Sequence, residues 1–311
     1  MKQNRLILAI TLAILASFGV PSSNLMAQNQ AKTLKRIVID PGHGGTDPGA
    51  NGRYSTEAAI SLAISLKLAD YIKSSLPDVE VVLTRTTDIF NSVVEKAKIA
   101  NAAKGDLFIC IHTNSADPSR NREVIGHTTK TKTVKKNGKK RKVTFKVPLY
   151  KVTYTPSSAR GTETFIYNVT KSDQRKEMAN DAVDEVVEKL DSESERQINE
   201  LNQADPTRSM MASLLTQQYF QRAASLALTI EEEFKNAGRL SREAKQRQKG
   251  IWVLAAVQMP AVLVETGFIS NPEDEDYLNS EEGQDQICEV ITKSLIRYKN
   301  SLENQKKTNA N

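Results

Sequence analysis

The sequence repeats one local arrangement, in which a short apolar run rich in β-branched residues is followed by polar turn residues and a helical pattern. The runs occupy residues 35–40, 79–85, 106–112, 162–168, 250–256 and 261–267. Runs of this length with nearly continuous hydrophobicity are typical of strands covered on both faces. We therefore predict an α/β three-layer fold, with a central six-stranded, mostly parallel or mixed sheet flanked by helices.

Helical periodicity is clearest in three segments, Glu57–Ser75, Ser92–Ala103 and Glu281–Tyr298. In the first, apolar residues recur on one stripe at helical spacing: Ile60, Ile64, Leu68 and Ile72. A stripe of this kind is the face that a helix packs against a sheet.

The first 27 residues have the layout of a secretory signal peptide. Two basic residues precede an apolar run from Leu6 to Val20, and small residues follow as far as Ala27. The run has about 15 residues, short of the roughly 20 that a helix needs to cross a bilayer. We therefore expect removal of residues 1–27, a short linker over 28–34, and a mature protein outside the cytoplasm without a stable membrane span.

The two cysteines are expected to be free thiols. Cys110 lies inside the apolar run "LFICIH", where a free cysteine behaves as a small buried hydrophobe. This placement favours two free thiols, Cys110 and Cys288, over a disulfide.

A basic insertion at about 117–158 interrupts the alternation of strands and helices. Its sequence "KTVKKNGKKRKVTFKV" has two β-prone arms around Asn137-Gly138, which predicts a hairpin. Residues 120–160 contain 13 Lys or Arg against one acid, a net charge of +12, although the whole chain carries only +6. Such an arm suits adsorption to anionic wall or membrane polymers, and a solvated charged loop is the alternative. We expect no nucleic-acid partner, because the protein is expected to be secreted.

A second insertion, residues 171–204, reads as a long, highly charged helix with one apolar face. A further helix is expected at about 207–237. The tail at 301–311 is polar and is expected to lack regular structure after Leu302.

Histidine is scarce, since His43, His112 and His127 are the only three in the chain. The first two each stand at the carboxyl end of a predicted buried strand, in "IVIDPGH" and "LFICIH". Loops leaving that edge of an open α/β sheet converge on the crevice where ligands bind. Two histidines at one edge favour a metal site, whereas His127 lies in the basic insertion and is given no metal role.

A hydrolytic zinc ion takes three protein ligands and leaves one position for water. His43 and His112 would supply two of them, and Glu57, which opens the first predicted helix, is a candidate for the third. The alternative role of Glu57 is a first-turn carboxylate that interacts with the helix dipole, with Thr56 as cap. Spacing alone does not choose between the two roles.

Glu265 ends the apolar run "AVLVE" and is therefore a candidate for catalysis, because a buried carboxylate is costly unless it is paired or used. The acids of residues 273–276 differ, because they follow Asn271-Pro272, which reads as the cap and first residue of a helix. We expect them to be ordinary first-turn acids.

Five ordered stretches of the chain carry a resemblance to a known family. They are "IVIDPGHGGTDPGA", the helix-opening Glu57, "ICIHTNSA", "ARGTETFIYN" and "VLAAVQMPAVLVETGFISNPEDEDYL". Together they resemble the zinc-dependent N-acetylmuramoyl-L-alanine amidases of bacterial cell walls, and they define a catalytic domain over residues 35–300. The resemblance implies hydrolysis of the amide that joins N-acetylmuramic acid to L-alanine in peptidoglycan.

The same resemblance implies the roles of four residues. One Zn²⁺ would be held by His43, Glu57 and His112, and Glu265 would be the catalytic base. Ala58 and Ser61 stand where many relatives have lysine and asparagine, which puts substrate detail in question and not metal binding. The glycines after His43, Gly44 and Gly45, are expected to leave room for the substrate.

The stretch "SMMASLLTQQYFQRAASLALTIEEEFKNAGRLSREAKQRQKGIWVL" resembles the cell-division branch of this family. In that branch an extra helical segment covers the zinc site until an activator protein draws it away. Residues 171–204 match that segment, which implies autoinhibition, an activator partner and a role in daughter-cell separation; a stabilising surface helix is the alternative. A short chain without repeated wall-anchoring modules, joined to this segment, favours the periplasm.

Two other functions remain open from the sequence. A catalytically silent wall-binding scaffold of the same fold would have lost a ligand or the base, whereas all four residues are present. A zinc peptidase or deacetylase acting on another wall amide would use the same ligand chemistry.

Overall fold

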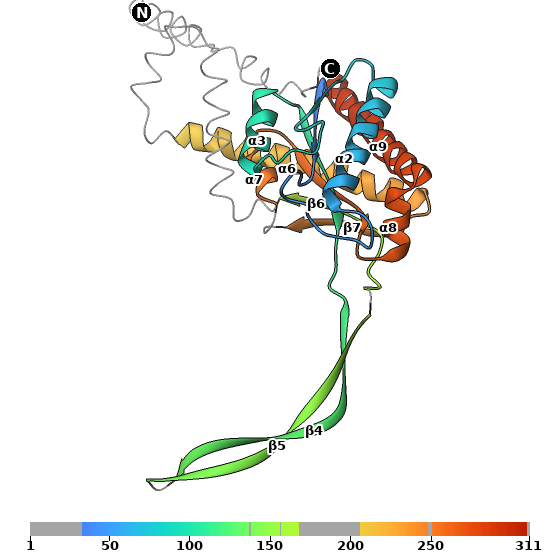
Figure 1. The fold of residues 1–311 in the computed structure, drawn as a ribbon. Coiled ribbons are helices and arrows are strands. Elements are labelled where there is room, and N and C mark those ends of the chain that lie inside the picture. Colours follow the sequence, from blue (N-terminus) through green and yellow to red (C-terminus); the bar gives the residue numbers. More distant parts are fainter. Residues whose placement is uncertain (1–32, 137, 156, 168–205, 248–250, 310–311) are drawn as a thin grey trace, which may run out of the picture. The chain divides into compact units, whose positions relative to one another are not determined.

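A six-stranded sheet forms the centre of the fold, with the strand order β2-β1-β3-β8-β6-β7 (Figure 1). Its strands are β1 (Arg36–Pro41), β2 (Glu80–Leu83), β3 (Leu107–Asn114), β6 (Thr162–Tyr167), β7 (Ser241–Arg247) and β8 (Ala261–Phe268). All neighbouring pairs are parallel except β6 and β8, which are antiparallel. The predicted mixed, mostly parallel sheet is therefore confirmed.

This computed structural model describes residues 33–136, 138–155, 157–167, 206–247 and 251–309. The expected signal peptide at 1–27 and the expected autoinhibitory segment at 171–204 lie outside the described residues. Leu34–Lys299 form one compact unit, and residues 300–309 of the described chain belong to a second.

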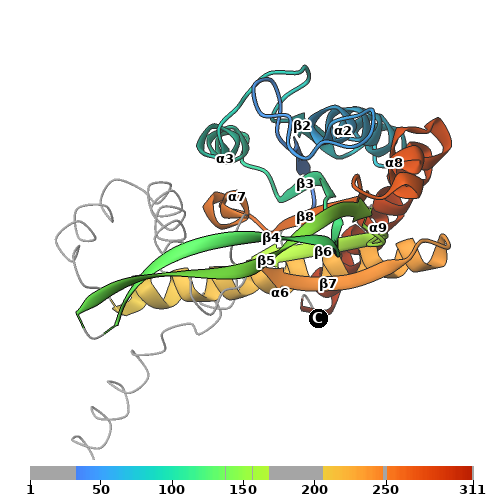
Figure 2. The same cartoon turned by 60° about the horizontal axis from the view of Figure 1, so that its bottom comes forward.

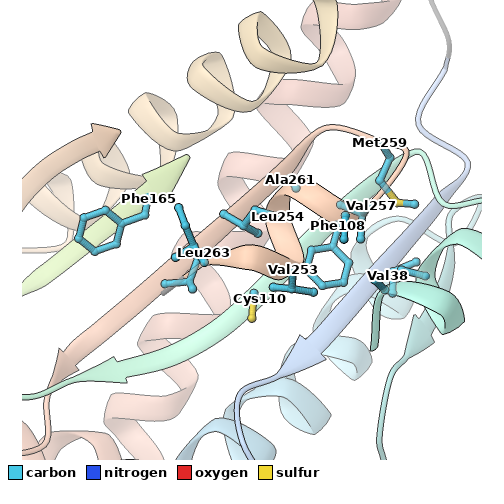
Figure 3. Packing of buried hydrophobic residues seen from close by; sticks show 14 residues of the cluster. Val38, Phe108, Cys110, Phe165, Val253, Leu254, Val257, Met259, Ala261 and Leu263 are labelled. Atoms are coloured by element: carbon cyan, nitrogen blue, oxygen red, sulfur yellow. The ribbon is translucent and has the colours of Figure 1, made fainter. Parts of the chain in front are cut away.

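Helices cover both faces of the sheet. They are α2 (Glu57–Ser75), α3 (Val93–Ala102), α6 (Pro206–Asn236), α7 (Trp252–Ala256), α8 (Pro272–Asn279) and α9 (Glu281–Asn309). On one face α3 and α7 pack against alternate strand residues such as Val38, Phe108 and Leu263 (Figure 3). On the other face the β6 threonines Thr162 and Thr164 donate hydrogen bonds to a glutamate of α6. The resulting layers are those predicted from the alternating pattern.

Side-chain caps fix where the helices begin. Thr56 accepts a hydrogen bond from the backbone N–H of Ala59 at the start of α2. Ser92 and Glu95 form a reciprocal capping box at the start of α3. Asn271 caps α8 and is followed by proline in the first turn, as expected from the sequence.

One predicted strand is wrong, because residues 250–256 contain the short helix α7 in place of the sixth strand. The sixth strand of the sheet is instead β7, in the polar stretch Ser241–Arg247, which pairs with β6 at the edge of the sheet. A short apolar run fits a buried helix as well as a buried strand, so its composition could not separate them. Charged residues are in turn common on edge strands, where they discourage further pairing.

The predicted basic hairpin is present as a separate two-stranded ribbon, β4 (Ser119–Lys136) and β5 (Lys139–Thr155). Its pairing continues from Ser119 opposite Thr155 to Lys136 opposite Lys139, with one irregularity between Val124 and Gly126. The two strands lie side by side and twist about each other along their length (Figure 2).

The structure also describes the two cysteines, the polar tail and the length of the helices. Cys110 and Cys288 are both free and buried, as predicted. The polar tail expected to be irregular after Leu302 instead continues α9 to Asn309, because its Glu, Gln and Lys residues favour helix. Within the described ranges, none of the helices combines the length and apolar character that a membrane span requires.

Candidate metal centre

Three of the four predicted site residues meet where β1 and β3 end. His43 follows β1, His112 lies in β3, and Glu57 is the first residue of α2. One potential ligand atom from each lies within 4.8 Å of the others. The two imidazole rings stand edge to face, with centroids 4.9 Å apart. The parallel pairing of β1 with β3 accounts for this meeting, since it brings their carboxyl ends to one edge.

Glu57 is the shared partner of both imidazoles. Its Oε1 lies 2.7 Å from His112 Nδ1, and its Oε2 lies 3.3 Å from His43 Nε2. Backbone N–H groups of Ala50 and Thr113 also donate to the carboxylate. Burial alone would raise the pKa of Glu57, but the hydrogen bonds to the histidines outweigh it and hold that pKa well below its ordinary value.

The second nitrogen of His43 has its own carboxylate partner. Asp47 Oδ2 lies 2.8 Å from His43 Nδ1, which leaves Nε2 directed to Glu57. Burial lowers the pKa of His43, but the hydrogen bonds to Glu57 and Asp47 exceed that effect and raise the pKa to about 9. A metal ion would have to displace this proton, so metal binding and protonation compete at the site.

These residues fit a zinc ion in two respects. Two imidazoles and one carboxylate, with ligand atoms this close together, are a donor set that catalytic zinc sites use. A carboxylate on the far nitrogen of a ligating histidine, as Asp47 is on His43, orients the ring and strengthens it as a ligand. The arrangement therefore contains both a candidate ligand set and a carboxylate placed to support it.

Two glycines create the space that the candidate ligands occupy. A Cβ on Gly42 would lie 2.6 Å from the ring of His112. A Cβ on Gly49, whose φ is +65°, would lie 2.7 Å from both Glu57 Oε2 and His43 Cδ2. Any larger residue at either position would displace the candidate ligands.

The missing side chains of Gly44 and Gly45 leave space that a neighbouring backbone segment fills, and the expected room for a substrate stays a prediction. A Cβ on Gly44 would lie 2.3 Å from the carbonyl oxygen of Ile89, and one on Gly45 would lie 2.5 Å from the backbone nitrogen of Phe90. Both glycines have positive φ and pack against that neighbouring segment. Both glycines therefore permit this close backbone packing.

Buried cations hold the turn that carries His43. The guanidinium of Arg85 donates to the carbonyl oxygens of Gly42 and Ala58, at 2.7 and 2.9 Å. Lys96 donates to the carbonyl of Pro41 at 2.7 Å and forms a salt bridge with the buried Asp40 at 3.0 Å. Arg85 thus links the turn before His43 to the first turn of the helix that begins with Glu57.

Glu265, the fourth predicted site residue, lies in β8 directly in register with His112 of β3. Residues in register on neighbouring strands direct their side chains to the same face of the sheet. Glu265 is only 6% exposed, and within the described part of the chain its buried Oε2 has no hydrogen-bond partner. Burial is the main cause that raises its pKa from 4.5 to about 7. A carboxyl group with this pKa can exchange a proton near neutral pH.

The sequence reasoning missed Glu163, which lies in register with Glu265 on the antiparallel strand β6. Its carboxylate accepts from Arg242 and Lys245 at 2.7 Å each, and from the Asn114 amide at 2.8 Å. A glutamate inside the apolar run "TETFIY" was the available signal, the same one that drew attention to Glu265.

Two acids expected to be ordinary first-turn residues of α8 have additional contacts. Glu275 has a fully buried side chain and accepts from the backbone N–H groups of Arg53, Tyr54 and Ser55, just before Glu57. Asp274 accepts from the backbone N–H groups of Gly161 and Phe268. Their spacing at a helix start gave no sign of these distant partners.

The chain matches a family profile described as N-acetylmuramoyl-L-alanine amidase over residues 37–297. It is 27% identical over 272 residues to the probable N-acetylmuramoyl-L-alanine amidase AmiB of Haemophilus influenzae, which covers 86% of this chain and 53% of that protein. It is 24% identical over 277 residues to N-acetylmuramoyl-L-alanine amidase AmiA of Escherichia coli, which covers 87% of this chain and 78% of that protein. The chain thus spans about half the length of the Haemophilus relative.

A solved structure shows the same fold. The CwlD amidase of Clostridioides difficile, solved in complex with the GerS lipoprotein, aligns with a TM-score of 0.52 at 22% identity, covering 85% of this chain and 98% of that chain. The family profile covers most of the 311 residues and spans all four candidate site residues. This protein therefore belongs to the N-acetylmuramoyl-L-alanine amidase family.

Proposed function

We propose that this protein is a zinc hydrolase of peptidoglycan that cuts the amide bond between N-acetylmuramic acid and L-alanine. The proposed zinc ligands are His43, Glu57 and His112, and the proposed catalytic base is Glu265. Membership of the amidase family supports the substrate and the bond. The observation that carries the proposal is the close approach of one ligand atom from each of the three residues, beside a buried carboxyl group in register with His112.

Each residue of the proposed site would have its own task. A zinc ion held here would lower the pKa of a bound water and polarise the amide carbonyl. Glu265 would take the proton from the attacking water and pass it to the leaving nitrogen of L-alanine. Its raised pKa suits both steps, because the group can hold and release a proton near neutral pH. Asp47 would keep the ring of His43 in the orientation that directs Nε2 to the metal.

The cellular role belongs to the same proposal. We infer that the enzyme acts in the periplasm, after removal of residues 1–27, and separates daughter cells by removing stem peptides from glycan strands. Residues 171–204 would cover the zinc site until an activator protein displaces them. Similarity to AmiA and AmiB supports a wall amidase, and the solved structure of CwlD in complex with a lipoprotein is a precedent for a protein partner.

Digestion of purified peptidoglycan tests the chemistry. Incubation with the enzyme should release stem peptides whose amino end is a free L-alanine, detected by mass spectrometry. A chelator should stop the release, and added zinc should restore it. Release of fragments cut at another amide would support a peptidase or deacetylase instead, and no release from the zinc-loaded enzyme without residues 171–204 would contradict the proposal.

A further inference from the structure

The distal part of the β4–β5 ribbon, residues 126–149, cannot neutralise its own charge. It contains nine Lys or Arg and no Asp or Glu. Its pairing is regular throughout, from Gly126 opposite Leu149 to Lys136 opposite Lys139. The positive charge therefore lies on a defined two-stranded surface, and any counter-charge must come from outside residues 126–149.

The register sorts the side chains of this ribbon onto two different faces. Residues directly opposite each other share a face, and successive residues alternate between faces. One face, here called the apolar face, includes the cross-strand pairs Lys130–Phe145, Lys132–Val143 and Val134–Arg141. The pairs Thr128–Val147 and Gly126–Leu149 continue it at one end, and Lys136–Lys139 at the other. Each large apolar side chain of the three pairs thus stands opposite a cation.

The reverse face has a different composition. It consists of the pairs His127–Pro148, Thr129–Lys146, Thr131–Thr144, Thr133–Lys142 and Lys135–Lys140. The hydroxyls of Thr131 and Thr144 lie 3.3 Å apart, within hydrogen-bond distance across the ribbon. Among the described residues of 126–149, this threonine face carries lysines but no valine, leucine or phenylalanine side chain. The two faces are therefore both cationic, and only one is also apolar.

The apolar face is open to solvent. Phe145 and Val143 are each 45% exposed, and Leu149 is 47% exposed. A two-stranded ribbon is marginally stable in water by itself, and its apolar side chains gain nothing until a second layer covers them. Exposed apolar side chains gathered on one face are a sign of an interaction surface.

The combination of apolar and cationic side chains selects the partner. A soluble anionic polymer would satisfy the lysines and leave Phe145 and Leu149 in water. A bilayer rich in acidic phospholipids satisfies both, because its headgroups attract Lys and Arg while the acyl boundary takes the apolar side chains. Lysine stems also lie along apolar surface with the charged group kept in water, which suits pairs such as Lys130–Phe145.

We propose that the apolar face of the ribbon is a docking surface for an anionic phospholipid bilayer. Phe145, Val143 and Leu149 enter the headgroup boundary, and Lys130, Lys132 and Arg141 contact the lipid phosphates. The ribbon lies on the bilayer without crossing it. This inference does not depend on the amidase activity, because none of the candidate site residues belongs to the ribbon.

Vesicle co-sedimentation tests the proposal with the chain from Gln28 onward, so that the apolar run Leu6–Val20 cannot contribute. Vesicles of phosphatidylcholine with about one-third phosphatidylglycerol should bind the protein, and pure phosphatidylcholine should not, with binding weakened by salt. Phe145→Ser should weaken binding by about tenfold or more, because it removes a large apolar side chain from the headgroup boundary. Thr144→Ser, on the threonine face, is the matched control and should bind as the unchanged protein does.

Charge and polymer controls separate a bilayer from other anions. Lys130→Gln with Lys132→Gln should weaken vesicle binding more than Lys140→Gln with Lys142→Gln, although both remove two charges. Phe145→Ser should bind soluble polyphosphate and purified peptidoglycan as well as the unchanged protein. Equal losses of vesicle and polyphosphate binding for Phe145→Ser would overturn the proposal.

A tryptophan placed on each face reports the orientation. The emission of Phe145→Trp should shift to the blue when anionic vesicles are added, whereas Thr144→Trp should not shift, each compared with the unchanged chain and its single Trp252. An equal shift on both faces, or none on either, would contradict a one-sided docking surface. An emission of Phe145→Trp that is already blue without vesicles would mean that protein covers the face, and would also overturn the proposal.

Discussion

Glu163 and Glu265 are register partners on the adjacent strands β6 and β8, yet the pKa values of their carboxyl groups shift in opposite directions. Burial tends to raise the pKa of Glu163, but Lys245 and Arg242 outweigh it and hold that pKa below its ordinary value. Burial raises the pKa of Glu265 to about 7, and the charges of Glu57 and Glu163 add to the rise. Two neighbouring carboxyl groups with opposite shifts are the arrangement that acid–base catalysis uses.

The substitution Glu163→Gln should lower the pKa of Glu265, because it removes a negative neighbour and leaves the charges of Arg242 and Lys245 uncompensated. Since the base must be ionised to act, the acid limb of the kcat/KM profile should move to lower pH. The rate near neutral pH should fall by about tenfold or less, as a weaker base is less effective. Glu123→Gln, on the exposed ribbon, is the control, and an unmoved limb would show that Glu163 has no influence on the base.

The substitution Asp47→Asn should weaken zinc binding by about 10–100-fold, as loss of a carboxylate behind a ligating histidine typically does. The change replaces the carboxylate that accepts from His43 Nδ1 by a neutral amide, while the shape of the side chain is retained. Competition titration with a zinc-binding dye measures the affinity directly. Asp70→Asn, an exposed carboxylate of α2, should leave it unchanged; equal affinities for both variants would mean that Asp47 does not support the ligand.

The substitution Gly42→Ala should disrupt the site, because the new methyl group would lie 2.6 Å from the ring of His112. We expect zinc affinity and amidase rate to fall by more than about tenfold, since a displacement of about 1 Å can already cost a hundredfold in rate. Gly126→Ala is the matched control, because its new methyl group would lie 3.9 Å from the nearest atom, Cδ1 of Leu149. Unchanged activity of Gly42→Ala would mean that His112 occupies another position in the working enzyme.

The substitution Glu275→Gln should lower the free energy of unfolding by about 2–4 kcal/mol near neutral pH, since it weakens a buried, charged hydrogen-bonding group. Burial raises the pKa of Glu275, but the backbone hydrogen bonds of Tyr54 and Arg53 and the Arg53 side chain lower it from 4.5 to about 2.

The pH dependence of that loss has a definite sign. A pKa lowered in the folded state gives stability that is full above about 4.5 and disappears as the pH falls through about 2. Denaturant titrations of both proteins across that range should therefore converge at the acid end. A difference that stays constant with pH would assign the loss to packing and not to charge.

Much of the fold could be predicted, because the spacing of apolar residues and the length of apolar runs can be read directly from the sequence. The runs at 35–40, 106–112 and 261–267 became three parallel central strands, and their order brought His43 and His112 to one edge. The prediction of a strand at 250–256 failed because composition does not distinguish a buried helix from a buried strand. The polar β7 was missed because an edge strand needs no apolar pattern.

The supporting residues of the site were less predictable, because their partners are distant in the sequence. Glu275 and Arg53 are 222 residues apart, and nothing at either position indicates the contact. The role of each glycine likewise depends on neighbours that are distant in the sequence and could not be predicted from it. Gly42 and Gly49 make room for the candidate ligands, whereas Gly44 and Gly45 pack against the segment that contains Ile89.

The central claim is that Glu265 acts as the base beside a zinc ion held by His43, Glu57 and His112. It is tested most directly by measuring stem-peptide release from peptidoglycan by Glu265→Gln, with the bound zinc determined in the same sample. The account predicts one zinc ion per chain, as in the unchanged enzyme, and a rate lowered by roughly 100-fold or more. A zinc-loaded Glu265→Gln variant that releases peptides at the unchanged rate would contradict it.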